Sequence, residues 1–190
     1  MPRRGLDRAA VVALAAAIAD REGLDAVTLA RVAAEAGVRP PSLYNHVAGR
    51  DDLVAGIALL GVRDLDAAMR DAAVGRAGDD ALGAAAGAYR GYAHEHPGRY
   101  AAAMRAPSAS DEELTAAAAD TVATVATLLR AWSLPPDEVV HAVRVVRAAL
   151  HGFVALEAVG GFGLPVDREA SFDRLVAALA AGLRTVPARA

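Results

Sequence analysis

The 190-residue chain contains no cysteine and no lysine, and only 4% of its residues are aromatic. Without cysteine there is no disulfide and no thiolate metal site, and a reducing cytoplasm is permitted. Because aromatic residues are so few, the core must be built from alanine, valine and leucine, within an apolar share of 55%. Alanine and leucine are among the strongest helix formers, so the composition favours an all-α protein.

The chain also lacks an excess of positive charge, since its formal net charge is −3. The charges are unevenly distributed, however: residues 1–50 carry seven arginines against five acidic residues. That asymmetry permits contact with DNA phosphates at the N-terminal end without requiring it. Residues 1–5 form a short basic arm, for which a solvated terminus and a phosphate contact both remain open.

No segment approaches the roughly 20 apolar residues that span a bilayer, so we expect no membrane partner. One stretch superficially resembles a secretory signal peptide, because Arg3 and Arg4 precede an uncharged run from Ala9 to Ala19. Charged residues interrupt the approach to this run and follow directly after it, and the run is needed as a first helix. We therefore predict a cytoplasmic protein.

The stretch from residue 28 to 54 has the pattern of two short helices joined by a tight turn and followed by a longer helix. Thr28 is a good N-cap, and Gly37 stands where a chain leaving a helix needs a positive φ. The two prolines that follow fit only the first turn of a helix, which predicts a second short helix over Ser42–Val47. This is a helix-turn-helix pattern, in which the second helix enters the DNA major groove.

Caps and breaks elsewhere predict seven more helices and no repeat. They run over about 7–22, 50–73, 80–94, 97–104, 110–132, 135–159 and 167–185. The predicted architecture is thus all-α with about nine helices: an N-terminal three-helix helix-turn-helix head and a C-terminal helical bundle.

The last two predicted helices carry wide apolar stripes. Such stripes indicate either a deep core or a self-association surface, and a two-fold pair of them would form a four-helix interface. The candidate dimer-interface residues are Val143, Leu150, Phe172, Leu175 and Leu179.

Four segments follow one another in the N-terminal part: Thr28-Leu-Ala-Arg-Val-Ala, Gly37-Val38, Leu43-Tyr44-Asn45-His46-Val47 and Gly49-Arg50-Asp51-Asp52-Leu53. In order, spacing and residue type they resemble the N-terminal domain of the TetR family of transcriptional repressors. Residues 149–157 and 171–175 more weakly resemble the C-terminal domain of a TetR subgroup named for a Trp-His-Gly motif. The His-Gly pair is present here at 151–152, but the tryptophan is not, since the chain's one tryptophan is Trp132.

The resemblance implies a homodimer of all-helical subunits. It implies a DNA-binding helix-turn-helix domain over residues 1–53 and an effector-binding and dimerisation domain over residues 54–190. It places Thr28 at a phosphate, Tyr44, His46 and Arg50 at the DNA backbone, and Arg39, Pro40, Pro41, Ser42 and Asn45 in the groove. These residue types suit those contacts, because asparagine pairs with adenine and arginine with guanine. For Tyr44, a partly buried core position is the alternative.

The candidate residues for an effector pocket are Tyr89, Tyr92, Tyr100, Met104, Arg147, His151 and Phe153, with ordinary core or surface positions as the alternative for each. We predict no catalytic residue, no cofactor and no metal site. His94 and His96 are two residues apart, so on a helix they point to different sides, and a solvated helix end is expected there.

The predicted function is that of a DNA-binding transcriptional regulator and not of an enzyme. More specifically, we expect a repressor that a small-molecule effector releases from a palindromic operator. The alternative is a helical small-molecule-binding protein or enzyme with a vestigial DNA-binding head, which predicts no specific binding to duplex DNA at physiological salt. The effector, the operator sequence, the target genes and the choice between repression and activation are not encoded in any recognisable motif.

Overall fold

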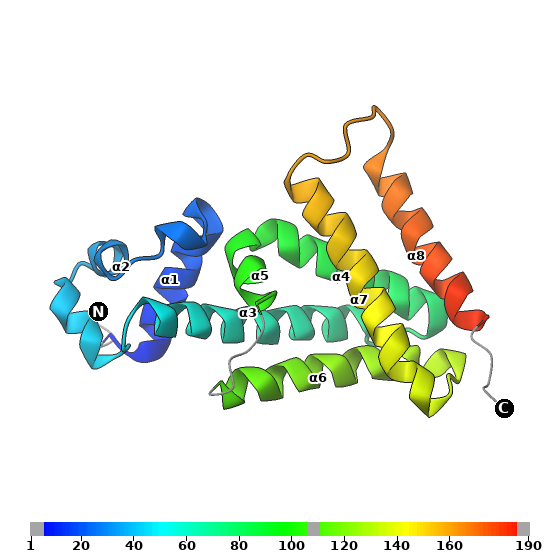
Figure 1. Ribbon diagram of the computed structural model, residues 1–190, viewed down its shortest axis with the longest axis horizontal. Coiled ribbons are helices and arrows are strands. Elements are labelled where there is room, and N and C mark those ends of the chain that lie inside the picture. The colour runs from blue at the N-terminus through cyan, green and yellow to red at the C-terminus, as the bar shows by residue number, and fades with distance from the viewer. Residues whose placement is uncertain (1–5, 106–110, 186–190) are drawn as a thin grey trace. The chain divides into compact units, whose positions relative to one another are not determined.

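The computed structural model describes residues 6–105 and 111–185, and this part of the chain holds helices, turns and loops without a β-strand. The helices are α1 (Arg8–Glu22), η1 (Leu24–Ala26), α2 (Leu29–Ala36), η2 (Pro40–Asn45), α3 (Arg50–Ala73), α4 (Gly78–Glu95), α5 (Pro97–Ala103), α6 (Glu112–Leu128), η3 (Leu129–Trp132), α7 (Pro136–Ala158) and α8 (Arg168–Arg184) (Figure 1). The all-α prediction is confirmed. In the described residues, the eight α-helices and η2 correspond to the nine predicted helices. The basic arm at residues 1–5 lies outside the described residues.

The predicted capping residues set the helix ends. The Asp7 carboxylate accepts a hydrogen bond from the Ala10 backbone N–H at 2.7 Å, which starts α1. The Thr28 hydroxyl accepts one from the Arg31 backbone N–H at 3.1 Å, which starts α2. At the other end of α2, Gly37 adopts the left-handed conformation with φ 67°. The caps and the turn were therefore readable from the sequence.

The helix predicted over Ser42–Val47 has a different form. It is a 3-10 helix, η2, and it begins two residues earlier than expected. Its first two residues are prolines, which have no N–H to donate, and its first bond runs from the Ser42 N–H to the Arg39 carbonyl at 2.9 Å. This i to i+3 spacing defines the tighter helix.

The described chain forms two compact units. Unit 1 comprises residues up to 64 together with 95–118, and unit 2 comprises residues 65–94 and those from 119 onward. The helices α3 and α6 each begin in unit 1 and continue into unit 2. The predicted functional division after residue 53 stays a prediction.

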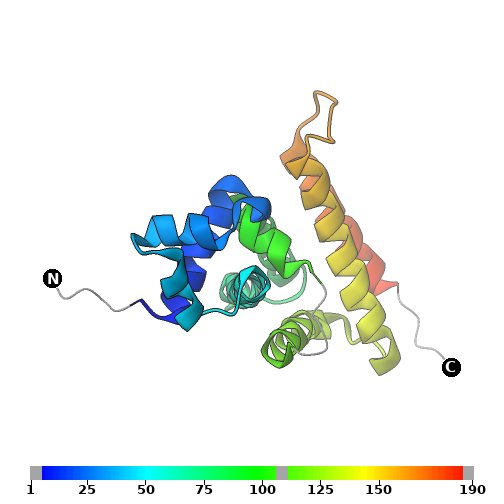
Figure 2. The same ribbon diagram turned by 60° about the vertical axis from the view of Figure 1, so that its left-hand side comes forward.

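Unit 1 is built around the helix-turn-helix. In it, α5 lies against α1 (Figure 2). The approach is so close that a Cβ on Gly98 would lie 2.1 Å from the Ala19 backbone carbonyl carbon. The core residues with no exposed surface include Val11, Ile18, Val27, Val32, Leu43, Leu53 and Ile57.

Unit 2 contains the two apolar helices at the C-terminal end of the chain, α7 and α8, which run side by side (Figure 1). Phe153 of α7 and Phe172 of α8 meet edge to face, with ring centroids 5.1 Å apart. The inner face of α7 is buried at Ala142, Val143, Val146, Leu150, Phe153 and Val154.

Two helical segments are long and apolar enough to cross a membrane by length and composition alone. They are Glu112–Trp132, with mean hydropathy 1.2, and Pro136–Ala158, with mean hydropathy 1.5. The expectation that no segment approaches such a composition is therefore wrong, because alanine and valine raise the average hydropathy of helices that also carry charged residues. The absence of a membrane partner stays a prediction.

Candidate nucleic-acid interface

The 3-10 helix η2 presents polar side chains on an apolar anchor. Leu43 is completely buried, whereas its neighbour Tyr44 is 61% exposed, so the alternative of a core position for Tyr44 is wrong. The exposed predicted DNA-contacting residues are Thr28, Arg39, Pro40, Pro41, Ser42, Tyr44, Asn45 and Arg50, and His46 is half-buried. All nine belong to unit 1. The helix is short, but the buried leucine fixes it on the core and leaves its polar residues available.

The start of α2 combines two features that suit a phosphate. The Thr28 hydroxyl oxygen accepts the Arg31 backbone N–H, so the proton of this hydroxyl remains available to donate to another acceptor. The helix N-terminus adds a partial positive charge. Thr28 is exposed, which is the arrangement that a backbone contact needs.

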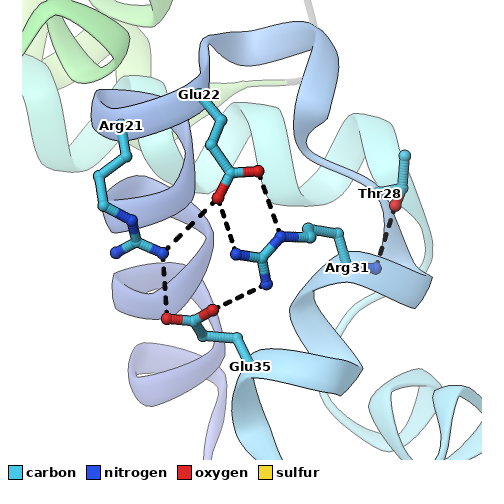
Figure 3. Close-up of polar contacts among 5 residues, drawn as sticks. All are labelled: Arg21, Glu22, Thr28, Arg31 and Glu35. Atoms are coloured by element: carbon cyan, nitrogen blue, oxygen red, sulfur yellow. Dashed lines mark hydrogen bonds and ion pairs between the residues drawn. The ribbon is translucent and has the colours of Figure 1, made fainter.

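An ion-pair network holds α2 against the end of α1 (Figure 3). Arg31 donates through Nε and Nη2 to the two oxygens of Glu22, at 3.2 and 2.7 Å, and through Nη1 to Glu35 at 2.7 Å. Arg21 donates to the other oxygen of Glu35 at 3.0 Å. The Arg31 guanidinium therefore joins the last residue of α1 to the last turn of α2.

The same network lowers the pKa of Glu22 and of Glu35, chiefly through the hydrogen bonds from Arg31. Sequence reasoning did not identify these residues. The i, i+4 spacing of Arg31 and Glu35 was a visible signal for one pair. The link from Arg31 to Glu22 had no such signal, since it depends on how α1 and α2 pack.

Arg50, the first residue of α3, is bound to the loop that precedes α2. Its Nε donates to the Val27 carbonyl at 3.0 Å, and its Nη2 donates to the Leu24 carbonyl at 3.1 Å. A carboxylate oxygen of Asp25 lies 3.8 Å from Nη2. The predicted contact of Arg50 with a DNA phosphate stays a prediction. In the structure the side chain binds two backbone carbonyls of the loop.

The described architecture, a helix-turn-helix head followed by an apolar helical unit, agrees with two family models. Residues 11–57 match the model described as "Bacterial regulatory proteins, tetR family", and residues 82–179 match "Tetracyclin repressor-like, C-terminal domain". The chain belongs to the TetR family. The predicted Trp-His-Gly subgroup is named in neither description and stays a prediction.

Relatives of this TetR-family chain agree with that assignment. It is 40% identical over 179 residues to the HTH-type transcriptional regulator Rv0681 of Mycobacterium tuberculosis (strain ATCC 25618 / H37Rv), covering 94% of this chain and 82% of the relative. It is 38% identical over 162 residues to the HTH-type transcriptional regulator YobS of Bacillus subtilis (strain 168), covering 85% and 84%. The crystal structure of the putative regulatory protein SCO4313 superposes with a TM-score of 0.74 at 25% identity, covering 90% and 94%. The protein is a DNA-binding transcriptional regulator.

The predicted effector-pocket residues are divided between the two units. Tyr100 and Met104 belong to unit 1, and the other five belong to unit 2. The side chains of Tyr89, Tyr92, Tyr100 and Phe153 are buried, whereas Arg147 is exposed and both His151 and Met104 are half-buried. The pocket stays a prediction.

Unit 2 holds an open groove of about 590 Å³ between α4 and α8, and sequence reasoning did not identify it. Gly83, Gly87 and Gly91 form part of its α4 wall, and a Cβ on any of them would meet no atom within 4 Å. Phe172, Val176, Ala177 and Ala180 form much of its α8 wall. None of the seven predicted pocket residues lines this groove.

Arg90 of α4 lies at the centre of a second network, at one end of the groove. Its Nε and Nη2 donate to the two oxygens of Glu157 on α7, each at 2.8 Å, and its Nη1 donates to Glu169 on α8. The guanidinium carbon lies 4.8 Å from the ring centroid of Phe172, within reach of a cation–π interaction. One side chain thus joins three helices of unit 2.

The Glu157 side chain is only 2% exposed, and two side chains contact its carboxylate. The hydrogen bond from Arg90 is the main cause that lowers the pKa of Glu157. A second contributor is His94, whose Nε2 lies 3.1 Å from a Glu157 oxygen. The expectation of a merely solvated helix end at His94 is therefore incomplete: the ring is half-exposed, but it contacts a buried carboxylate 63 residues away in the sequence.

The predicted dimer-interface residues differ in exposure. Val143, Leu150 and Phe172 are buried within a single chain, while Leu175 and Leu179 are half-buried. The outer face of α7 instead exposes Val145 and Leu156, by 56% and 48%, and Val159, directly after the helix, is 79% exposed. Val143 and Leu150 therefore pack inside the chain, and the dimer interface stays a prediction.

Proposed function

We propose that this regulator is a homodimeric repressor that a small-molecule effector releases from a palindromic operator. The observation that supports DNA reading is the exposure of Arg39, Tyr44 and Asn45 around the buried anchor Leu43. Arg39 and Asn45 have the donors and acceptors that read guanine and adenine in the major groove. Tyr44, His46 and Thr28 suit the phosphates on either side.

A homodimer supplies the second recognition element. Two copies of η2 related by a two-fold axis enter successive major grooves about 34 Å apart, which explains a palindromic site. The exposed apolar residues on the outer face of α7, with the half-buried Leu175 and Leu179 of α8, support a helical self-association surface in unit 2.

Effector release requires two states of the dimer, one with correctly spaced heads and one without. An effector shifts that equilibrium only by its difference in affinity for the two states. Buried tyrosines of unit 2, Tyr89 and Tyr92, are the candidates that combine an apolar wall with a polar group. We further propose that the protein acts in the cytoplasm, without catalysis and without a membrane partner.

The experiment that tests this function is selection of bound sites from random duplex DNA, repeated in the presence of candidate effectors. We expect enrichment of a palindrome with half-sites one helical turn apart, and loss of that enrichment with the correct effector. The alternative, a small-molecule-binding protein or enzyme with a vestigial DNA-binding head, predicts no enriched sequence at physiological salt. Enrichment of a single, asymmetric half-site would contradict the dimer.

A further inference from the structure

The loop between α1 and α2 is closed by an arginine that comes from a different helix. The loop runs from Gly23 to Thr28 and contains the 3-10 helix η1. The residue that binds it, Arg50, is 23 residues beyond the nearer of the two carbonyls. Nε and Nη2 of the guanidinium each meet one carbonyl, of Val27 and of Leu24, at 3.0 and 3.1 Å. Both donors lie on one edge of a rigid plane, so the side chain fixes the two carbonyls relative to each other.

We propose that Arg50 is a positioning residue for DNA binding, which holds this loop and so sets the place at which Thr28 and the start of α2 meet the DNA backbone. The proposal rests on the proposed DNA contact of Thr28. It assigns the guanidinium a role that differs from the direct phosphate contact expected by resemblance.

The Val27 carbonyl is the link between Arg50 and Thr28. This carbonyl belongs to the peptide bond that joins Val27 to Thr28. Because that bond is planar, a carbonyl held by Arg50 also fixes the Thr28 N–H. The Val27 side chain is completely buried, which holds the same peptide from the core side. Thr28 then caps α2 through the Arg31 N–H. A displacement of the Arg50 guanidinium is thus passed to the cap through one peptide unit.

The two ends of the helix-turn-helix are joined by the same residue. Arg50 begins α3, directly after the segment that follows η2, whereas the loop it binds lies directly before α2. On its other side, α2 is held to α1 by the Arg31 network (Figure 3). The recognition elements are therefore bounded by two arginines, one of which pairs with carboxylates and one with backbone carbonyls.

One of the two donor edges of the Arg50 guanidinium is already engaged. Bidentate arginine–phosphate contacts use two N–H groups on one edge of the guanidinium, and here the Nε/Nη2 edge binds carbonyls. The side chain is still 42% exposed, so exposure alone does not distinguish the two roles. Replacement by lysine does distinguish them, because an ammonium keeps the charge for a phosphate but lacks the planar fork that spans two carbonyls.

The test measures the DNA affinity of the full-length protein against salt concentration, on the duplex found by selection, for wild type, Arg50→Lys and Arg50→Ala. Arg174→Ala is the matched control, because Arg174 is an exposed arginine in unit 2 and its Nη1 donates to the Ala170 carbonyl of its own helix. If Arg50 positions the loop, both Arg50 variants bind roughly tenfold more weakly, as expected for losing a charged hydrogen bond. The slope of log K against log salt then stays at the wild-type value.

A phosphate contact gives the opposite pattern and overturns the proposal. Arg50→Lys then retains wild-type affinity, and Arg50→Ala lowers the magnitude of the salt slope by about 0.9, the value for one phosphate. Failure of wild type itself to bind any duplex contradicts the proposed function instead, so the two failures are distinguishable.

A measurement without DNA distinguishes local loosening of the loop from unfolding of the whole protein. Backbone amide exchange at Val27, Arg31 and Val32, whose N–H groups bond to the Leu24 carbonyl, the Thr28 hydroxyl and the Thr28 carbonyl, should become faster in Arg50→Lys. Exchange at residues of unit 2 such as Val146 should stay slow. Unchanged exchange at Val27, Arg31 and Val32 in Arg50→Lys would overturn the positioning role, whatever the affinity.

Discussion

Unit 1 and unit 2 contain the same ionic arrangement in two different environments. In unit 1, Arg31 binds one glutamate with Nε and Nη2 and a second glutamate with Nη1; in unit 2, Arg90 does the same. The partners of Arg31 are Glu22 and Glu35, with side chains 37% and 30% exposed. The Glu157 carboxylate beside Arg90 is 2% exposed.

The difference in burial decides what each network can do. Water competes for the exposed charges around Arg31, and salt screens them, so this network orients α2 while adding little to stability. In the Arg90–Glu157 pair the side chains are only 15% and 2% exposed, so each of these two charges depends on the other, although Glu169 is 68% exposed. The comparison indicates that geometry alone does not reveal the energetic importance of an ion pair.

The two regions also differ in what they leave exposed. Unit 1 exposes hydrogen-bonding side chains on η2, whereas unit 2 exposes valine and leucine on α7. A substitution on η2 should change DNA affinity without changing the free energy of unfolding. A substitution in the Arg90 network should change the free energy of unfolding without changing DNA affinity. The following predictions test that separation, from the largest expected effect to the smallest.

Loss of the buried charge should have the largest effect on stability. Glu157→Gln leaves Arg90 without its principal counter-charge, and we expect a decrease of about 3 kcal/mol in the free energy of unfolding, the scale for breaking a buried pair. Urea denaturation measures it. The matched control is Glu22→Gln, which removes the corresponding glutamate from the Arg31 network and should destabilise far less. Equal losses in the two variants would show that burial does not separate the networks.

The same carboxylate should dominate the acid side of the stability profile. Its pKa in the folded protein lies below the ordinary value of 4.5, chiefly because Arg90 donates to it. The folded state therefore binds the proton less readily than the unfolded chain, so the contribution is complete above pH 4.5 and is lost as the pH falls through the lowered pKa.

Urea denaturation over this range should show that wild type loses stability more steeply with falling pH than Glu157→Gln does. The pKa of Glu22 is also lowered, but the contribution of this exposed carboxylate to stability should disappear at about 1 M salt, where the Debye length is about 3 Å. Parallel pH profiles for wild type and Glu157→Gln would contradict the assignment.

Asn45→Ala should alter sequence preference and leave stability unchanged. An asparagine that pairs with adenine discriminates against a wrong base by roughly tenfold, so preference at one position in each half-site should be lost. Selection from random duplexes, compared with wild type, measures the change. An unaltered preference at every position would exclude direct reading by Asn45.

Tyr44→Phe should have the smallest effect. It removes one hydroxyl from a side chain that is 61% exposed, and we expect roughly fivefold weaker DNA binding, the scale of one hydrogen bond, with no change in thermal stability. Fluorescence anisotropy with labelled duplex measures the affinity. Tyr92→Phe, at a buried tyrosine of unit 2, is the control and should leave DNA affinity unchanged.

Local sequence signals predicted the fold well because they act within a few residues. The Asp7 and Thr28 caps, the Gly37 turn and the breaks at proline each placed a helix end to within one or two residues. They failed on the form of η2, where two successive prolines remove donors and the shorter i to i+3 bond closes the turn. The residues of η2 were nevertheless the ones that the sequence identified.

The amino-acid sequence by itself determined that this chain is all-α, where its α-helices begin to within about two residues, and that its first part has the residue order of a TetR-family head. Those features depend on caps, turns and helical periodicity, which are short-range. Only the tertiary structure decided that Arg50 binds the loop before α2, and that Arg90 meets a carboxylate 67 residues away. Such contacts depend on which faces of distant helices pack together, and no spacing along the chain encodes that choice.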